Sequence, residues 1–254
     1  MAHTEARGSG GHLEYRGRSV RIRSCPISID VAGFDELARD PEVQQEARRI
    51  REQVDDRQIV LGIDRLDYTK GIDARIKAFE TLLARYDDLA AEVVFVQIAV
   101  PSREMVPEYA RIRTHIEQHV GRVNGDWGRP GLVPVHYLYR SFDRRELVAW
   151  YQAADVMAVT PLRDGMNLVA KEYVAARADG RGVLLLSEFA GAAEELRDAI
   201  LVNPHDVDGM ASALERSLDL PEDEMRERMT KMRAQVERND VRLWASGFLG
   251  MLAS

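Results

Sequence analysis

The fold of this chain is decided by the stretch QIVLGIDRLDYTKGIDARIKAFETLLARY, which runs from Gln58 to Tyr86. It begins with QIVLGI, a short apolar run of the length of one buried β-strand. It ends with IDARIKAFETLLARY, whose apolar residues recur every three to four positions, as on the buried face of a helix. Between them lies RLDYTKG, a loop that carries two cations and ends in glycine. The stretch therefore predicts a strand, a loop and a helix.

The same alternation continues toward the carboxyl terminus. Further apolar runs with the character of strands are VVFVQIAV (93–100), VPVHYLY (133–139), DVMAVT (155–160), GVLLLS (182–187) and AILVN (199–203). Helical patterns separate them, namely EYARIRTHIEQHVGRV (108–123), DRRELVAWYQAA (143–154) and NLVAKEYVAAR (167–177). Strands that are apolar throughout and alternate with helices are typical of a parallel sheet covered on both faces. We therefore predict an α/β fold with a doubly wound parallel sheet of the Rossmann-like kind.

The amino-terminal part has a different rhythm. Residues 17–30, GRSVRIRSCPISID, alternate apolar and polar residues and predict one or two strands. Residues 33–54 predict a helix that is broken near Pro41, because proline cannot continue the helical hydrogen bonding. The first dozen residues are rich in glycine and serine and predict a flexible start.

The bulk composition excludes several classes of protein. The chain has 254 residues and a formal net charge of −7, whereas a general nucleic-acid binder would be basic. A single cysteine rules out an internal disulfide framework and fits a reducing compartment. No apolar run approaches the roughly 18 to 20 residues of a membrane helix, and the start shows no secretory signal. We expect a cytoplasmic protein that partners neither nucleic acid nor membrane.

A second loop, in TPLRDGMNLVAKEY (Thr160–Tyr173), also follows a strand. If a helix begins near Asn167, the N–H groups of residues 165–169 point out of its start and form an anion site with the helix dipole. Asp164 could accept hydrogen bonds from sugar hydroxyls, and Glu172, roughly 7.5 Å along the helix from Asn167, could hold a ribose. The pattern is equally that of a helix cap with Asp164 as an N-terminal charge.

The first loop supplies positive charge. Arg65 and Lys70 could act as paired cations toward a departing diphosphate, and Asp67 could orient one of them. A solvated charged loop would have the same sequence. Neither a G-x-G-x-x-G fingerprint nor a nucleotide-triphosphatase loop occurs in the chain. His115 and His119 have the i, i+4 spacing of a metal pair, but no third ligand is near them in the sequence, so we expect no metal.

On these residues the chain resembles the trehalose-6-phosphate synthase family, which are retaining glycosyltransferases with two Rossmann-like domains. The resemblance covers Tyr15 to the carboxyl terminus. It is carried by GIDRLDYTKGI, QIAVPSRE, FDRRELVAWYQAADVMAVTPLRDGMNLVAKEYVAAR, SEFAGAAEEL and LVNPHD, in this order. It implies the donor-binding domain of a GT-B type glycosyltransferase.

The resemblance assigns roles residue by residue. It implies that Arg65 and Lys70 bind the donor diphosphate, that Asp164 contacts the transferred glucose, and that Glu172 holds the ribose. Arg65, Lys70 and Asp164 are thereby the expected catalytic residues. Arg103 is expected to reach the phosphate of the acceptor. The remaining donor-binding positions are Phe142, whose backbone would meet the base, with Gly165, Met166, Asn167, Leu168 and Val169 at the helix start.

The resemblance also implies an activity and a division of the chain. The activity is transfer of glucose from UDP-glucose, or another NDP-glucose, to glucose 6-phosphate, with no cofactor. We expect remnant strands of a largely absent N-terminal domain after a flexible start in residues 1–42, the donor domain in residues 43–239, and a crossover helix in residues 240–254. The fragment alone is expected to be inactive, and self-association stays open as a further partnership.

Two other functions fit the same residues. One is a related transferase with another phosphorylated acceptor, such as glycerol 3-phosphate or a cyclitol phosphate. The other is a module that binds a nucleotide sugar without catalysis. Donor binding is common to all three functions, so only an assay of transfer with defined acceptors separates them.

Overall fold

The centre of the molecule is a parallel β-sheet. The computed structural model describes residues 6–9, 11–15, 17–86, 88–102 and 105–252. The described residues form a six-stranded sheet in the order β6-β5-β4-β7-β8-β9, in which each neighbouring pair is parallel. The strands are β4 (Gln58–Arg65), β5 (Val93–Val100), β6 (Val135–Leu138), β7 (Val156–Val159), β8 (Val183–Ser187) and β9 (Ile200–Val202). The predicted doubly wound α/β fold is confirmed.

The strand order places a reversal at the middle of the sheet. From β4 the chain builds outward through β5 to β6, and it then returns to add β7, β8 and β9 on the other side of β4. Strands β4 and β7 are paired through Val60 with Val156 and Leu61 with Met157. In open α/β sheets, ligands bind at the carboxyl ends of the strands where the order reverses. The fold thus marks the loops after β4 and β7.

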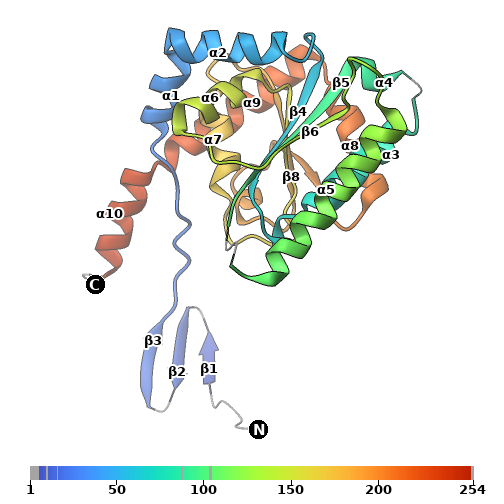
Figure 1. Ribbon diagram of the computed structural model, residues 1–254. Coiled ribbons are helices and arrows are strands. Elements are labelled where there is room, and N and C mark those ends of the chain that lie inside the picture. The colour runs from blue at the N-terminus through green and yellow to red at the C-terminus, as the bar shows by residue number, and fades with distance from the viewer. Residues whose placement is uncertain (1–5, 10, 16, 87, 103–104, 253–254) are drawn as a thin grey trace.

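Helices cover both faces of the sheet (Figure 1). One face carries α1 (Val31–Arg39), α2 (Pro41–Glu52), α6 (Arg144–Ala153), α7 (Leu168–Ala176) and α9 (Glu222–Arg238). The other face carries α3 (Ile72–Leu83), α4 (Leu89–Glu92), α5 (Pro107–Trp127) and α8 (Val207–Leu218). Each layer buries its own hydrophobic core, as the apolar stripes of these helices predict.

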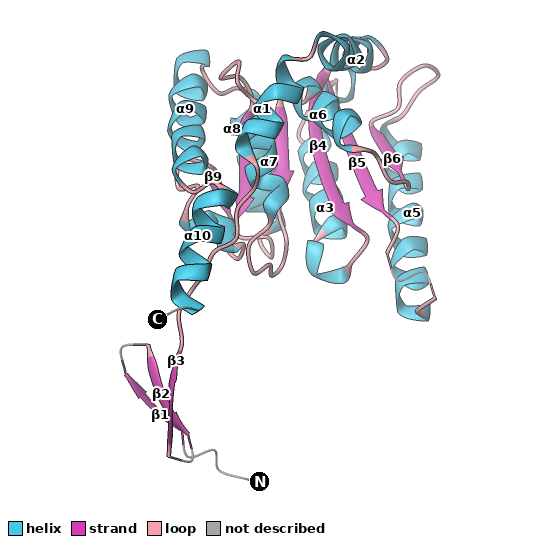
Figure 2. Ribbon diagram, turned by 90° about the vertical axis from the view of Figure 1, so that its left-hand side faces the viewer, coloured by secondary structure: helices cyan, strands magenta, loops and turns pink. Residues whose placement is uncertain are grey.

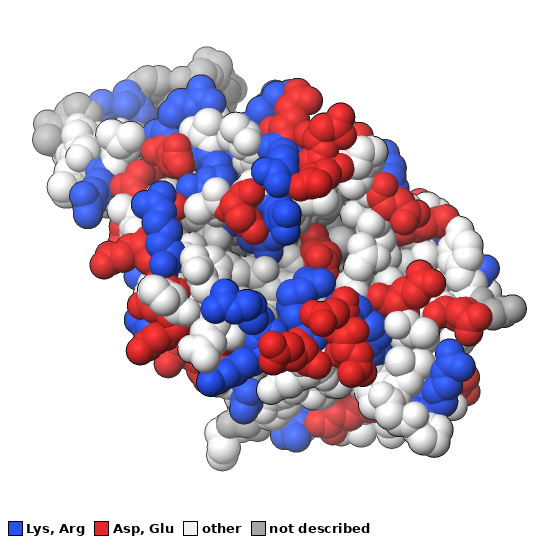
Figure 3. Space-filling view, turned by 90° about the horizontal axis from the view of Figure 1, so that it is seen from above, with Lys and Arg blue, Asp and Glu red and all other residues white. Residues whose placement is uncertain are grey.

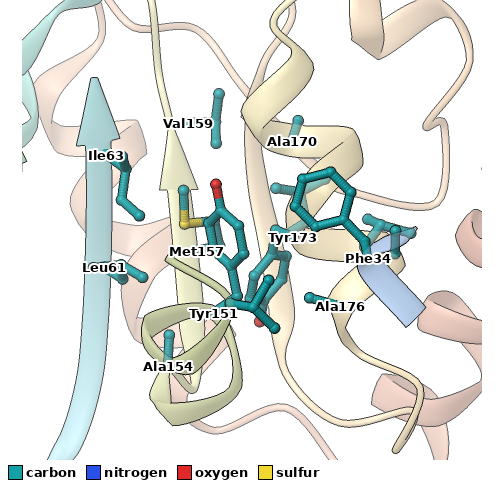
Figure 4. Close-up of a cluster of buried hydrophobic side chains, with 14 of the residues drawn as sticks. Phe34, Leu61, Ile63, Tyr151, Ala154, Met157, Val159, Ala170, Tyr173 and Ala176 are labelled. Carbon is teal, nitrogen blue, oxygen red and sulfur yellow. The ribbon is translucent and has the colours of Figure 1, made fainter. Parts of the chain in front are cut away.

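The core beneath α6 and α7 matters for the site. Tyr151 of α6 and Tyr173 of α7 are fully buried there, with ring centroids 6.2 Å apart and planes at 77°. Met157 of β7 and Phe34 of α1 complete this part of the core (Figure 4). This edge-to-face packing fixes the position of α7 relative to α6.

The helix predicted over residues 33–54 is indeed broken at Pro41. Helix α1 ends at Arg39, and Asp40 caps α2 by accepting a hydrogen bond from the N–H of Glu42. Both helices contribute to one core, through Phe34 of α1 and Val43 of α2. The expected boundary between residues 42 and 43 therefore lies inside α2, in one packed layer, and the division of the chain into domains stays a prediction.

The described residues before residue 22 differ from the expected flexible start. They form a three-stranded antiparallel sheet of β1 (Ala6–Ser9), β2 (His12–Tyr15) and β3 (Arg18–Arg21). Gly11 and Gly17 have φ angles of +81° and +75°, which only glycine adopts readily. The glycines mark the turns of this small sheet, which is why composition alone suggested flexibility. Only β3 falls in residues 17–30, and the rest of that stretch has no regular structure.

The small sheet lies apart from the main body, on the side toward which the strands of the large sheet point their carboxyl ends (Figure 2). Helix α10 (Val241–Leu252) projects on the same side. It is joined to the chain before α1, because the Val241 N–H donates to the Ile29 carbonyl at 3.0 Å. Leu243, Leu249 and Leu252 of α10 are exposed. Among the described residues, no helix combines the length and apolarity required to span a bilayer.

Candidate functional site

The two loops singled out by the sequence lie against each other at the strand reversal. We call residues 65–71 the β4 loop and residues 160–167 the β7 loop. The Leu162 N–H donates to the Thr69 carbonyl at 2.8 Å. Gly71, with φ +66°, lies so close to the Thr160 carbonyl that a Cβ atom would come within 2.4 Å of the oxygen. Only glycine fits there, so the terminal glycine of RLDYTKG is what lets the loops meet.

An ion pair joins the loops at the proposed ligand position. Lys70 Nζ lies 2.5 Å from Asp164 Oδ2, and the two side chains are 14% and 16% exposed. Asp164 also accepts hydrogen bonds from the Met166 N–H at 3.3 Å and from Asn167 Nδ2 at 3.2 Å. The sequence predicted both residues at the site. It did not predict that they neutralise each other.

The start of α7 has the open donors that an anion needs. Asn167, with φ +75°, is the N-cap residue, and its side chain accepts from the Ala170 N–H at 3.2 Å. In the described part of the chain, no hydrogen bond engages the N–H groups of Leu168 and Val169. The predicted helix start near Asn167 is confirmed. The row of unpaired donors is shorter than predicted, because Asp164 already binds the Met166 N–H.

The other charges of the β4 loop divide. Arg65, at the end of β4, is exposed and forms no ion pair with a described residue. The sequence suggested that Asp67 orients Arg65 or Lys70, but no hydrogen bond or ion pair joins its carboxylate to either of those described side chains. Its carboxylate accepts from the Thr69 N–H at 2.9 Å and from the Tyr109 hydroxyl at 2.9 Å. Asp67 therefore caps the short turn η1 (Tyr68–Lys70), and these hydrogen bonds help lower its pKa against the opposing effect of burial.

Beneath the loops lies a buried charge that the sequence analysis missed. Arg75 of α3 is 1% exposed and donates to Asp64 Oδ2 at 2.7 Å, Gln97 Oε1 at 2.9 Å and Thr160 Oγ1 at 2.9 Å. It also reaches the Lys70 carbonyl at 3.3 Å. Arg75 thus ties both loops to the sheet from below. Asp64 and Gln97, polar residues inside apolar strands, were the signal for such a network.

Glu172 lies further along α7, with one oxygen already fixed. Its Oε2 atom accepts a hydrogen bond of 2.8 Å from the Tyr151 hydroxyl. Burial raises the pKa of Glu172, while Tyr151 and, more weakly, Arg144 oppose that rise. Within the described residues, no hydrogen bond reaches the other oxygen, Oε1. One half of the carboxylate is therefore available to a ligand.

One predicted residue, Phe142, lies outside this centre. Phe142 follows β6 and is half-buried, packed edge-to-face on Trp150 with the Arg140 guanidinium 4.3 Å above its ring. It is in the layer of α6 and not in either loop. Arg103 lies outside the described residues.

The histidine pair has a structural environment. His119 is buried, with Nδ1 2.8 Å from Asp73 and Nε2 2.9 Å from Glu80, both on α3. His115 Nε2 lies 3.0 Å from the same Asp73. The hydrogen bond to Asp73 and that to Glu80 raise the pKa of His119 despite its burial. Across the described residues, no group of His, Cys, Asp or Glu side chains is arranged to hold a metal.

A cavity of a different kind lies at the amino ends of the strands, opposite the two loops. It has a volume of about 490 Å³ and is lined by residues that include Arg51, Asp155, Arg177 and Asp179. Its arginines are already paired: Arg51 with Asp155 and Arg177 with Asp179, each at 3.0 Å, and Arg181 with Glu222 at 3.8 Å. Seen from above, this side of the molecule mixes positive and negative side chains (Figure 3). The free N–H groups of Leu168 and Val169 therefore favour the carboxyl ends of the strands as the place where an anion binds.

A six-stranded parallel sheet with this strand order, covered by helices on both faces, defines the class of Rossmann-like domains. The chain belongs to glycosyltransferase family 20, whose family model matches residues 1–254.

Relatives agree over nearly the whole chain. It is 52% identical to a trehalose-6-phosphate synthase of Mycobacterium avium over 244 residues, which are 96% of this chain and 50% of that protein. A trehalose-6-phosphate synthase of Mycobacterium tuberculosis is 52% identical over 93% of this chain and 47% of its own length. The chain thus spans about half the length of the curated relatives it matches.

Solved structures show the same architecture. An α,α-trehalose-phosphate synthase (UDP-forming) of Burkholderia xenovorans in complex with glucose-6-phosphate superposes with a TM-score of 0.93 at 40% identity, over 99% of this chain and 56% of that one. The E. coli protein bound with UDP-2-fluoro glucose gives a TM-score of 0.92 at 38% identity, over 98% and 56%. The predicted Rossmann-like fold of a GT-B type glycosyltransferase is confirmed.

Proposed function

We propose that this chain is the donor-binding half of a retaining glycosyltransferase. The enzyme transfers glucose from UDP-glucose, or another NDP-glucose, to glucose 6-phosphate, which gives trehalose 6-phosphate and the nucleoside diphosphate. One observation carries the proposal: Lys70 and Asp164 form their ion pair beside the free N–H groups of Leu168 and Val169 at the strand reversal. The B. xenovorans and E. coli structures, with their stated ligands, support this choice of substrates.

The proposed chemistry is stabilisation of a leaving group. When the bond between glucose and diphosphate breaks, negative charge grows on the diphosphate oxygens. Lys70, Arg65 and the start of α7 face that charge, and groups placed in advance lower the barrier without reorganising. The acceptor hydroxyl attacks from the face of the departing diphosphate, which takes the proton. The positive charge comes from the protein, so this scheme asks for no metal ion.

Besides holding Lys70 in place, Asp164 can bind the glucose of the donor. Without donor, Lys70 and Asp164 neutralise each other. When a diphosphate arrives, Lys70 turns part of its charge to the phosphate, and the Asp164 carboxylate becomes free to accept hydrogen bonds from glucose hydroxyls. Charge-assisted hydrogen bonds of this kind are about twice as strong as neutral ones. The pair would thus couple phosphate binding to glucose binding.

The remaining predicted residues complete the donor. Gly165, Met166 and Asn167 line the approach to the helix start, Glu172 holds the ribose, and the backbone at Phe142 meets the base. Arg103 reaches the phosphate of the acceptor. The curated relatives are about twice as long as the matched region. We place the rest of the acceptor site in their additional half, which is the proposed partner of this chain. The proposed location of the enzyme is the cytoplasm.

The test combines binding with transfer. Calorimetric titration should show that the chain binds UDP and UDP-glucose. Glucose transfer to glucose 6-phosphate should appear only when the amino-terminal half of a family relative is added. Glycerol 3-phosphate as an alternative acceptor tests a related transferase. Donor binding without transfer to any acceptor in the mixture would favour a binding module, and no donor binding at all would overturn the proposal.

A further inference from the structure

Helix α6 supplies the side chain of Tyr151 to the candidate site, where it contacts Glu172 and not the proposed diphosphate position. The Tyr151 hydroxyl donates to Glu172 Oε2 at 2.8 Å across the α6–α7 interface. The Tyr151 ring is completely buried and held edge-to-face on Tyr173 (Figure 4). A buried ring fixed by packing has little freedom, so its hydroxyl is a rigid anchor for the carboxylate.

We propose that Tyr151 is a positioning residue of the donor site, whose hydroxyl holds Glu172 so that the free oxygen Oε1 meets the ribose hydroxyls. This inference rests on the proposed function, because it assumes that Glu172 binds the ribose. A carboxylate on a helix otherwise rotates about its side-chain torsions. A fixed one loses less conformational entropy when the ligand binds.

The same contact also extends the pH range in which the carboxylate is ionised, against the larger effect of burial. Two groups of α6, Tyr151 and Arg144, act on the Glu172 carboxylate, and Asp64 of β4 acts on Tyr151. Burial raises the pKa of Glu172, and the Tyr151 hydrogen bond lowers it. Burial also raises the pKa of Tyr151 well above its usual value, so its hydroxyl stays a donor. Without Tyr151, Glu172 would take up a proton at a higher pH.

The experiment is a titration of UDP-glucose at a series of pH values. Both phosphates of this donor are esterified, so it lacks the proton that a phosphate monoester takes up near about pH 6. Tyr151→Phe should weaken binding at neutral pH by about two- to tenfold and move the acid limb of the binding curve up by about 0.5 to 1 pH unit. Glu172→Gln should remove that limb.

Tyr173→Phe is the matched control. It removes an equally buried hydroxyl from the neighbouring ring, and the Tyr173 hydroxyl has no hydrogen-bond partner among the described residues. This variant should bind and titrate like the parent. Thermal unfolding of each variant separates loss of folding from loss of positioning.

The outcomes separate the inference from the function on which it rests. If Glu172→Gln binds and titrates like the parent, the ribose role itself is wrong. If Glu172→Gln removes the acid limb but Tyr151→Phe titrates like the parent, only the positioning role is wrong. If Tyr151→Phe unfolds, UDP-glucose binding by the double variant Tyr151→Phe, Glu172→Gln is compared with binding by Glu172→Gln alone. The inference requires that Tyr151→Phe has no further effect on binding once Glu172 is Gln.

Discussion

The two ends of the candidate donor site hold their charges in opposite ways. At the phosphate end, Lys70 and Asp164 come from two loops and balance each other across 2.5 Å. At the ribose end, Glu172 comes from a helix, and its nearest partner is the neutral hydroxyl of Tyr151. At the first end an ion pair neutralises the charge, whereas at the second a hydrogen bond from Tyr151 supports the carboxylate and burial disfavours its ionised form.

This difference teaches how each end should respond to its surroundings. A largely buried ion pair responds strongly to the loss of one partner and only weakly to salt. A buried carboxylate with a raised pKa responds to pH, because it gains a proton as the pH falls. Substitutions at the two ends should therefore differ in both size and signature.

The largest effect is expected at Lys70. Lys70→Ala leaves the Asp164 carboxylate unpaired beside the diphosphate, so loss of attraction and gain of repulsion add up. Truncating one partner of a buried charge pair costs roughly 2 to 5 kcal/mol, so UDP binding should weaken by about thirtyfold or more. Calorimetric titration measures it, with Lys77→Ala, an exposed lysine of α3, as the control. Equal binding by Lys70→Ala and the parent would remove the phosphate end from the site.

A smaller loss is expected at the ribose end. Glu172→Ala removes hydrogen bonds to a charged group, worth roughly 1.5 to 3 kcal/mol, so UDP should bind about ten- to a hundredfold more weakly. A deoxyribose analogue of UDP should lose less affinity in the variant than UDP does. If both ligands lose the same affinity, Glu172 does not hold the ribose.

These expectations rest on features that the sequence reveals unequally. The apolar strands, the helices and the chemistry of RLDYTKG and RDGMN could be predicted, since periodicity and loop chemistry are local. The ion pair of Lys70 with Asp164 and the role of Asp67 could not, because partners are chosen by tertiary contacts. Arg75 was missed for a related reason: charged residues are usually exposed, and only the fold shows what this one ties together.

A third measurement sharpens the comparison through pH. Helix α3 begins at Ile72, two residues after Lys70, and His119 binds this helix through Asp73 and Glu80. Since the pKa of His119 is raised above 6.5, its contribution to stability is complete below that pH and is lost as the pH rises through the folded pKa. Asp73 and Glu80, with lowered pKa values, lose their share only in more acidic solution.

The variant His119→Gln tests this dependence. Urea unfolding should show a loss of about 1 to 2 kcal/mol at about pH 6 and a smaller loss at about pH 9. His136→Gln is the control, and its pH dependence should be opposite, with the smaller loss of stability at the lower pH. The reason is that burial lowers the pKa of His136. A loss in His119→Gln that is the same at both pH values would show that the histidine is not charged in the folded state.

The smallest effect is expected at Arg65. This side chain is exposed, and exposed charges gain only about 0.2 to 1 kcal/mol from a partner, so Arg65→Ala should weaken UDP binding only about two- to fivefold. The difference from the parent should shrink as salt rises, because the screening length falls to roughly 3 Å at 1 M. A salt-independent loss would place Arg65 in a desolvated contact and erase its contrast with Lys70.

The most direct test of the central claim is a crystal structure of the chain with UDP bound. We predict that the diphosphate lies at the N–H groups of Leu168 and Val169 with Lys70 Nζ within hydrogen-bonding distance, and that Glu172 contacts the ribose. UDP seated instead in the cavity at the opposite edge of the sheet, against Arg51 and Arg177, would contradict the account.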